Sequence, residues 1–425
     1  MPGPLEGVRV IEFTEIIAGP VGGMLLADFG ADVIKVEPPW GDPWRSTSPG
    51  LAGGPNESRG FIAVNRGKRS IRVDLTKPGG RSVVYKMVED ADVIVLNHRP
   101  DVPAKLGIDY ETLSTINPRI IYCEVTAYGR LGPNKELPGY DVIVQAVTGM
   151  MTSEGHDVDG LPRAVNVSPV SDMAAGYAIM MSVSAALYYR EKTGKGQKIE
   201  NSLLQNSLRM QQSSLTQLDD FPTPRQVWRD EDLPVLKEAG VEFSQIYATY
   251  RDQRYNPEFA AYYQPYETSD WVISIGCLSN PLREKMANAL GVHDIRFDPG
   301  YDREAPESTV FAENLILTYR KLFAEKTTDE WTSILMAAGV PCGPMRFIEE
   351  MVYDEQALAN GMVVETPHAT AGNTRGPGPL SNMSESPLEI TRGAPAFGEH
   401  RDEILREAGY SEAEVEALVT NKDVF

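Results

Sequence analysis

An aspartate at the start of a long apolar stretch is the side chain best placed for covalent chemistry in this sequence. Asp172 directly precedes residues 173–189, which carry no charge and are rich in Ala and Met. A carboxylate at a helix N-terminus accepts hydrogen bonds from free backbone N–H groups and is favoured as an anion by the helix dipole. Asp172 is therefore either a simple N-cap or a carboxylate nucleophile for an electrophilic carbonyl, and spacing alone does not separate the two.

A group of glycines near the N-terminus invites comparison with a dinucleotide-binding motif. Gly19, Gly22 and Gly23 follow a predicted strand, and Glu37 ends the next one. The spacing G-P-V-G-G differs from G-x-G-x-x-G, however, and Pro20 lacks the N–H that would bind a pyrophosphate. The pattern favours a tight turn packed on a sheet over an NAD or FAD site.

Metal and hydrolase motifs find no support in the sequence. The histidines show no H-x-x-x-H pairing; they are His98, His156, His293, His368 and His400. No G-x-S-x-G or phosphate-loop pattern occurs. We therefore expect no bound metal and no permanently bound cofactor.

Composition limits the partners and the compartment. The 425 residues include 40 Lys plus Arg against 60 Asp plus Glu, which gives a net charge of −20 and disfavours nucleic acid or an anionic membrane as partner. The uncharged run 173–189 is shorter than the ~20 residues of a spanning helix, so a buried helix is expected. Three dispersed cysteines and a start without signal-peptide features predict a cytoplasmic protein.

The first half of the chain alternates between strand and helix patterns. Strands are predicted at 8–13, 33–37, 70–75, 92–96 and 119–125. Helical stretches are predicted between them at 21–29, 80–89 and 110–116. This βαβ alternation predicts an α/β fold with a parallel, doubly wound sheet that would position Asp172 and its helix, 172–190.

The second half is more varied and suggests a smaller domain. A strand merging into a helix is predicted at 198–204, a linker at 219–229, a hairpin at 262–276, helices at 282–290 and 311–323, and a loop at 369–386. The tail 401–418 carries helix signals, with Ser411 and Glu414 as a capping box. We expect a large domain from 1–214, a small domain over 225–325, and a segment 330–425 that returns to the large domain.

Several blocks of the sequence resemble the family III CoA-transferases of the formyl-CoA transferase type, in the CaiB/BaiF superfamily. They are LEGVRVIEFTEIIAGPVGGMLLADFGADVIKVEPPWGDPWR, NRGKRSIRVDL, ADVIVLNHRP, NPRIIYCEVTAYG, PGYDVIVQA, the Asp172 segment closing on REKTGKGQ, and AGVPCGPM. The resemblance covers residues 5 to about 418. It implies a Rossmann-like large domain, a smaller α+β domain and a homodimer interlocked as linked rings.

The resemblance also implies roles for individual residues. Asp172 would attack an acyl-CoA thioester to form an aspartyl anhydride and then an aspartyl-CoA thioester. Tyr140 and Asp141 match the Tyr and acidic residue beside CoA and the nucleophile. Racemases of 2-methylacyl-CoA on the same fold carry His at the position of Tyr140, so the sequence favours a transferase over that alternative. A noncatalytic CoA-binding protein is a third hypothesis, and Asp172 argues against it.

For CoA itself the resemblance points to three segments and a lysine. The implied binding residues are Ile16, Ile17, Ala18, Val73 to Thr76, Asn97, His98, Arg99 and Lys105. Basic side chains there would suit the phosphates of CoA.

The sequence departs from the family pattern at four places. Pro38 replaces an arginine, so a phosphate or adenine contact is expected from Arg45, Arg66 or Lys68. Ile17 replaces a glutamine, and His98 replaces a ring that normally stacks. Residues 256–266 (NPEFAAYYQPY) stand where a Gly-rich lid is expected. The sequence does not identify the acids exchanged, nor whether transfer is inter- or intramolecular.

Overall fold

The chain folds into two compact units. A computed structural model describes residues 3–47, 58–154, 156–165, 169–252, 257–302 and 305–425. Unit 1 consists of Met1–Pro222 and Glu355–Phe425, and unit 2 consists of Thr223–Asp354. Each unit has a hydrophobic core of its own.

Unit 1 is built around a six-stranded sheet whose neighbouring strands all run parallel. The strand order is β3-β2-β1-β4-β5-β8. The strands are β1 (Arg9–Phe13), β2 (Asp32–Glu37), β3 (Arg69–Arg72), β4 (Val93–Leu96), β5 (Ile121–Thr126) and β8 (Gln197–Ser202). This confirms the predicted α/β fold with a doubly wound sheet, in which the order reverses between β1 and β4.

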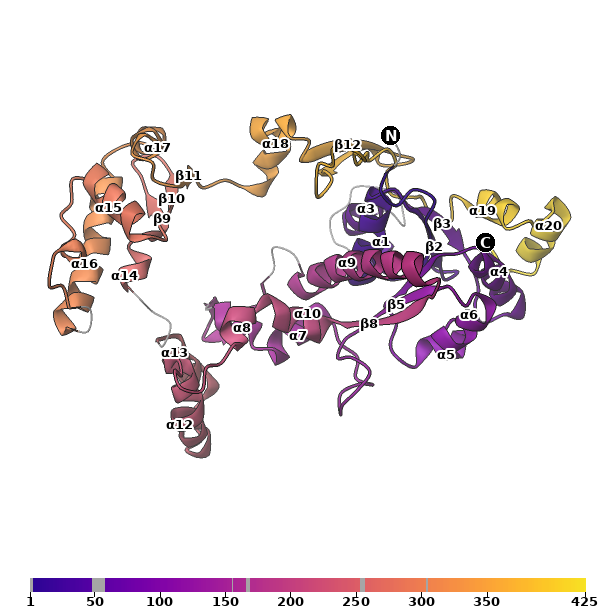
Figure 1. The fold of residues 1–425 in the computed structure, drawn as a ribbon, viewed down its shortest axis with the longest axis horizontal. Coiled ribbons are helices and arrows are strands. Elements are labelled where there is room, and N and C mark those ends of the chain that lie inside the picture. The colour runs from indigo at the N-terminus through magenta and orange to yellow at the C-terminus, as the bar shows by residue number, and fades with distance from the viewer. Residues whose placement is uncertain (1–2, 48–57, 155, 166–168, 253–256, 303–304) are drawn as a thin grey trace. The chain divides into compact units, whose positions relative to one another are not determined.

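Both faces of this sheet are covered by helices (Figure 1). One face is covered by α1 (Ala18–Asp28) and α9 (Val170–Thr193). The other face is covered by α4 (Pro78–Glu89), α6 (Tyr110–Ile116), α19 (Arg401–Glu407) and α20 (Glu412–Thr420). Alternation along β1 explains the two cores, because Val10 packs toward α1 and α9 while Ile11 packs toward α4. Strands buried on both faces are expected to be apolar throughout.

The glycines that resembled a turn lie inside helix α1. A Cβ on Gly22 would come within 2.6 Å of the Ile179 side chain on α9, and a Cβ on Gly23 within 1.7 Å of a Glu12 oxygen. The prediction of a tight turn was therefore wrong, because these residues are helical. These glycines let α1 approach α9 and the sheet closely.

Shorter elements complete unit 1. They are α2 (Trp44–Thr47), α3 (Arg59–Asn65), α5 (Val102–Leu106), α7 (Asp141–Val147), α8 (Met150–Glu154), β6 (Asp157–Val158), β7 (Leu161–Pro162), α10 (Leu203–Met210), α11 (Gln212–Leu215), α18 (Glu355–Ala359), β12 (Val363–His368) and β13 (Gly372–Pro377). The strand that merges into a helix is confirmed as β8 and α10. The expected loop 369–386 is partly wrong, because β13 pairs antiparallel with β12.

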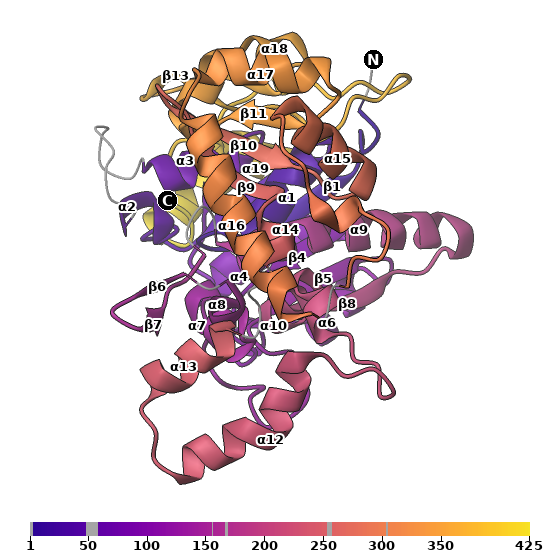
Figure 2. The same cartoon turned by 90° about the vertical axis from the view of Figure 1, so that its left-hand side faces the viewer.

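Unit 2 packs helices against a three-stranded antiparallel sheet of order β11-β10-β9, and Figure 2 shows these elements from a second side. Its strands are β9 (Tyr263–Glu267), β10 (Val272–Gly276) and β11 (Cys342–Pro344). Its helices are α12 (Pro224–Glu238), α13 (Phe243–Asp252), α14 (Pro257–Ala260), α15 (Asn280–Ala289), α16 (Pro306–Phe323), α17 (Thr328–Ala337) and the 3₁₀ segments η1 (Ile295–Phe297) and η2 (Ile348–Tyr353). The predicted hairpin and its two helices are present.

Three segments near the unit boundaries differ from the sequence interpretation. Residues 224–229 start α12 rather than forming a linker, because Thr223 caps that helix with Gln226. Residues 330–354 pack in unit 2, where β11 pairs with β10. The tail forms α19 and α20 instead of one helix, and the predicted Ser411–Glu414 capping box starts α20.

Helix α9 has the length and mean hydropathy, 1.3, of a membrane span. Its residues Ala175, Ile179 and Val183 are buried in the core that α9 shares with α1 and the sheet. The buried helix expected from the sequence is thus found on one face of α9 only, because Tyr177, Met181, Tyr188 and Tyr189 are exposed.

Candidate active site

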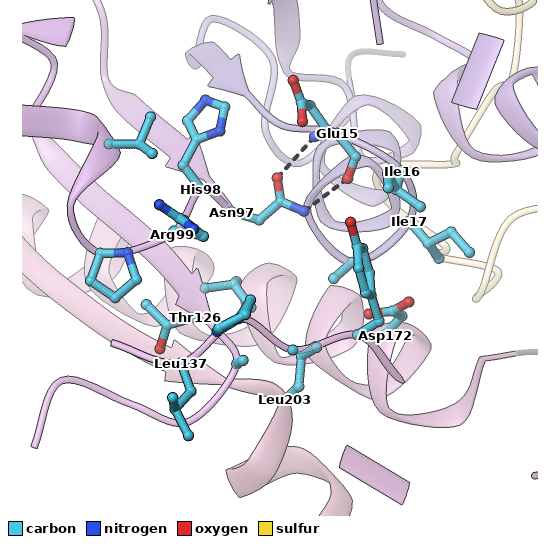
Figure 3. Close-up of a pocket in the computed structure, with 18 residues that line it drawn as sticks. Glu15, Ile16, Ile17, Asn97, His98, Arg99, Thr126, Leu137, Asp172 and Leu203 are labelled. Atoms are coloured by element: carbon cyan, nitrogen blue, oxygen red, sulfur yellow. Dashed lines mark hydrogen bonds between the residues drawn. The ribbon is translucent and has the colours of Figure 1, made fainter. Parts of the chain in front are cut away.

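A cavity of about 330 Å³ opens at the carboxyl ends of the central strands. Residues 15–18 follow β1, residues 97–100 follow β4, and residues 125–127 end β5; all of them line it, together with Tyr140 and Asp172. Because β1 and β4 are the strands where the sheet order reverses, the cavity occupies the topological switch point. Figure 3 shows Ile16, Ile17 and Asp172 on one side of it, with His98 and Arg99 on the other.

Asp172 contributes a carboxylate to this cavity without capping its own helix. Pro169 is the N-cap of α9 and Asp172 is the third helical residue, so the expectation of an Asp172 N-cap was wrong. No hydrogen bond or ion pair of its carboxylate is recorded within the described part of the chain. Burial, and then the nearby negative charge of Asp141, raise the pKa of Asp172 to about 7. The group is thus an unpaired carboxyl that can hold or lose its proton near neutrality.

Asp141 supports the same helix from a neighbouring one. Its Oδ1 accepts a hydrogen bond from the Ser171 N–H at 2.7 Å, and its Oδ2 accepts one from Gln145 Nε2 at 2.6 Å. This buried first residue of α7 therefore caps α9 in place of Asp172. Asp141 does not line the cavity, whereas Tyr140, the N-cap of α7, does so with 65% of its surface exposed.

The loop between β1 and α1 is held by side chains from other strands. Asn97 accepts a hydrogen bond from the Glu15 N–H at 2.8 Å and donates one to the Glu15 carbonyl at 2.8 Å, as the dashed lines in Figure 3 mark. Asn97 lines the cavity as expected, but its amide is engaged with the backbone of this loop. Its position is better explained by loop support than by a ligand contact alone.

A second cavity of about 220 Å³ shares Glu15, His98 and Val102 with the first. Of the residues expected to bind CoA, Val73 and Thr76 line this second cavity. The first cavity is lined by Ile16, Ile17, Ala18, Asn97, His98 and Arg99. Burial, and then the charge of Lys35, lower the pKa of His98 to about 4, so its ring is neutral at neutral pH.

The basic residues expected to compensate for Pro38 do not reach either cavity. Arg45 binds Glu37 at 2.7 Å, Arg66 binds Asp28 at 2.7 Å, and Lys68 binds Glu12 at 2.8 Å. None of the three lines either cavity. That expectation was therefore wrong, because each cation is engaged with a carboxylate of its own.

Lys105 also lies outside the two cavity linings. Its ammonium pairs with Asp101 at 2.6 Å, and its side chain is 70% exposed. Arg99, which pairs with the same carboxylate at 3.3 Å, is the cationic side chain that does line the first cavity.

Several residues that line the first cavity were not predicted from the sequence, and three of them share a position in the sheet. Glu15, Thr126 and Leu203 stand at or just after the carboxyl ends of β1, β5 and β8. The rule that ligands bind beyond the carboxyl ends of parallel strands could have identified them. The aromatic segment 256–266 belongs to unit 2, and its Asn256 lies outside the described residues.

Within the described ranges, no group of three or more His, Cys, Asp or Glu side chains is arranged to hold a metal ion. The polar groups around the cavity include the unpaired Asp172 carboxyl, a second carboxyl in Glu15, the neutral His98 imidazole and the Arg99 guanidinium. Such a set suits covalent and hydrogen-bonding chemistry on an organic substrate.

Comparison with known proteins places the chain in a family. Residues 5–401 match the family model described as CoA-transferase family III. The chain is 32% identical to succinyl-CoA:glutarate CoA-transferase of Mus musculus over 98% of this chain and 89% of that protein. It is 34% identical to succinate–glutarate CoA-transferase of Agrobacterium fabrum over 95% of each chain.

A solved structure agrees with this assignment. A CAIB/BAIF family protein from Brucella suis superposes with a TM-score of 0.73 at 29% identity, over 96% of this chain and 100% of that one. The chain therefore belongs to CoA-transferase family III and is an enzyme of that family.

Proposed function

We propose that the enzyme moves CoA from an acyl-CoA thioester to a carboxylic acid, with Asp172 as the covalent carrier. The observation that carries this proposal is the unpaired Asp172 carboxyl in the cavity at the switch point of the sheet. Its pKa of about 7 leaves a substantial anionic fraction at neutral pH, and an anion is the form that attacks a carbonyl.

In the first half of the reaction, the Asp172 carboxylate attacks the thioester carbonyl. The carbon–sulfur bond breaks, CoA leaves as a thiolate, and a mixed anhydride remains. The thiolate then attacks the aspartyl carbon of this anhydride. The donor acid departs as a carboxylate, and an aspartyl-CoA thioester is left on the protein.

The second half reverses these steps with the acceptor. The acceptor carboxylate attacks the aspartyl-CoA carbonyl, the thiolate leaves again, and a new anhydride forms. Attack of the thiolate on the acceptor's acyl carbon releases the new acyl-CoA and regenerates the Asp172 carboxylate. Because each step exchanges a bond of similar reactivity, the thioester energy is kept as long as water is excluded.

The backbone at the start of α1 supports this chemistry. Ile17 and Ala18 line the same cavity, and no hydrogen bond of either N–H is recorded within the described ranges. Unpaired N–H groups at a helix N-terminus stabilise developing negative charge on an oxygen. We assign them the carbonyl oxygen of the reacting thioester.

The two joined cavities suggest how CoA lies. The thioester end would occupy the cavity with Asp172, and the adenosine end would occupy the second cavity beside Val73 and Thr76. His98 borders both and, as a neutral ring, can pack against the ligand between them. The interlocked homodimer and the cytoplasmic location remain predictions.

The relatives guide the choice of substrates to test. Those from mouse and Agrobacterium fabrum are named for succinyl-CoA and glutarate, so a dicarboxylate donor and acceptor are the first pair to try. No observation favours the racemase alternative, because Tyr140 stands at the position where the racemases carry a histidine base. Proton exchange at the α-carbon in deuterated water tests that alternative directly.

Trapping the intermediate tests the proposal. Protein incubated with succinyl-CoA and then with hydroxylamine should carry a hydroxamate on the peptide that contains Asp172, read by mass spectrometry. The Asp172→Asn variant should lose both the adduct and transfer to glutarate, by on the order of 10⁴-fold or more. It should still bind CoA.

A matched control uses the second carboxylate of the cavity. Glu15→Gln should still form the adduct at Asp172, because the proposal gives Glu15 no covalent role. Full transfer activity in Asp172→Asn, or an adduct on Glu15 instead, would refute the assignment.

A further inference from the structure

Ile16 has a backbone conformation that its side chain disfavours. Its φ is 69°, in the left-handed region, which a β-branched residue rarely adopts. The other described non-glycine residues with positive φ, Asp159 and Lys422, do not line the cavity. Conformations of this kind persist only where the surroundings enforce them, and they concentrate at functional sites.

Asp42 supplies the contact that enforces this conformation. Its Oδ1 accepts hydrogen bonds from the Ile16 N–H at 3.1 Å and from the Trp44 N–H at 2.9 Å. The Asp42 side chain is buried, so these bonds do not compete with solvent. One oxygen therefore holds two backbone positions, one in the loop after β1 and one at the start of α2.

The charge on Asp42 is held in turn by a buried lysine. Lys35 Nζ lies 3.0 Å from Asp42 Oδ2 and donates a hydrogen bond to the Thr14 carbonyl at 2.7 Å. Burial by itself would raise the pKa of Asp42, but Lys35 and the two N–H groups outweigh burial and lower it. Asp42 is thus an ionised hydrogen-bond acceptor. The Lys35 ammonium also binds the backbone of the same loop, at the Thr14 carbonyl two residues before Ile16.

The two backbone positions that Asp42 holds, Ile16 and Trp44, pack against the first turn of α9. Ile16, Ile17, Trp44 and Met173 pack in one apolar cluster. Met173 is the neighbour of Asp172 in α9. A change in the backbone at Ile16 would therefore shift both the Ile17 N–H and the packing beside the proposed nucleophile.

We propose that Asp42 is a positioning residue for the transferase site, which acts by holding Ile16 in its left-handed conformation. Asp42 does not line the cavity, so it reaches the substrate only through the loop. The proposal rests on the proposed function for its kinetic readout, but not for its structural one. Without Asp42, Ile16 relaxes to a negative φ and the first N–H groups of α1 turn away from the reacting carbonyl.

Glycine at position 16 separates the backbone effect from other effects. Glycine adopts a positive φ without steric cost, whereas alanine does not. Ile16→Gly and Ile16→Ala remove nearly the same packing, so a difference between them reports the backbone alone. In the Asp42→Ala background, Ile16→Gly should restore most of the lost kcat, and Ile16→Ala should not.

The experiment measures kcat and KM for transfer from succinyl-CoA to glutarate. Asp42→Ala should lower kcat by about tenfold or more, which matches the usual cost of such a backbone conformation. KM for succinyl-CoA should change less. Asp42→Asn keeps an oxygen acceptor for the Ile16 N–H, so it should retain most of the kcat and a positive φ at residue 16. If Asp42→Ala does not fold, Asp42→Asn decides the question, because a negative φ at residue 16 with full kcat in that variant would overturn the proposal.

Crystal structures of Asp42→Ala and of the double variant Asp42→Ala, Ile16→Gly give a readout independent of turnover. We expect a negative φ at residue 16 in the first and a positive φ in the second. A positive φ kept in Asp42→Ala, or equal kcat values for the glycine and alanine double variants, would overturn the proposal. If instead Asp172→Asn transfers CoA normally, the proposed function fails while the φ measurement still decides the role of Asp42.

Discussion

Two carboxylates at or near the cavity, the buried Asp42 and the partly buried Asp172, differ in the partners that folding gives them. Asp42, beneath the loop after β1, contacts a lysine ammonium and two backbone N–H groups, and its pKa is lowered. Asp172, at the head of α9, has no hydrogen-bonding or ionic partner among the described residues, and burial, followed by the charge of Asp141, raises its pKa. Burial raises the pKa of both, so partners decide the outcome. A fully satisfied carboxylate fixes structure, and an unsatisfied one facing a cavity is available to react.

The largest expected effect is the loss of stability on removing the cation that pairs with Asp42. Lys35→Met removes the ammonium that lies 3.0 Å from Asp42 and 3.5 Å from Glu12, and leaves buried carboxylates behind. The free energy of unfolding should fall by about 3–5 kcal/mol, measured with urea at neutral pH. Lys105→Met is the control, since its exposed pair with Asp101 should cost less than about 1 kcal/mol. Equal losses in the two variants would show that burial of the network contributes nothing.

Removing the charge of Asp172, which has no such partner within the described ranges, should instead raise the free energy of unfolding. The unfolded chain releases the Asp172 proton near the ordinary pKa of 3.8, and the folded protein releases it near 7. Ionisation therefore destabilises the fold progressively between these pH values and fully above them. Asp172→Asn should gain roughly 2 kcal/mol at pH 8, a figure reduced for partial solvent screening, and nothing below about pH 4.

Asp42→Asn provides the contrast to that prediction. The pKa of Asp42 is lowered, so its ionisation stabilises the fold above its unfolded pKa, and this variant should lose stability at pH 8. Urea unfolding of both variants across the pH range tests the pair of signs. A stability loss in Asp172→Asn at pH 8 would contradict the account of that residue.

A smaller change should appear in the pH profile of the reaction. Asp141 raises the pKa of Asp172 by like-charge repulsion, after burial. Asp141→Asn removes that charge while keeping an oxygen for the Ser171 N–H, so the lower midpoint of kcat/KM against pH should move to lower pH. Asp109→Asn, at another helix-capping aspartate, should leave the midpoint in place. An unmoved midpoint in Asp141→Asn would show that the charge of Asp141 does not raise the pKa of Asp172.

The smallest expected effect concerns the third acidic side chain. Glu15 lines both cavities, and burial, followed by Asp42, raises its pKa. Glu15→Gln should bind CoA about three- to fivefold more tightly by calorimetry, because a negative charge no longer faces an anionic ligand. Pantetheine, which lacks the phosphates, should show no such gain. An equal gain for pantetheine would mean that charge is not the cause.

Much of the fold could be predicted because its signals are local. Runs such as Val10–Ile11 and the alternation of strands with apolar helices mark a parallel sheet without reference to distant residues. The errors occurred where a local pattern had two meanings. Gly22 resembles a turn residue but serves close packing on α9, and residues 224–229 resemble a linker but begin a capped helix.

Residues that line the site could be predicted from the sequence, but the ion pairs that engage nearby basic side chains could not. Ile16, Asn97 and His98, which the family resemblance implied would bind CoA, line the cavity, and their contact with CoA stays a prediction. Arg66 was expected near a phosphate, yet it binds Asp28 and donates to the carbonyl of Pro377, a residue far along the chain. Which cations remain available for a ligand depends on such pairings, and sequence spacing does not reveal them.

The sequence by itself determined the family, the sheet and the aspartate on which the proposed chemistry depends, because hydrophobic period and motif order are carried by neighbouring residues. Only the tertiary structure decided that Asp172 has no partner within the described ranges while Asp42 has three, and that Ile16 is held in a left-handed conformation. The physical reason is that the charge state of a buried carboxyl depends on desolvation and on partners brought together by folding.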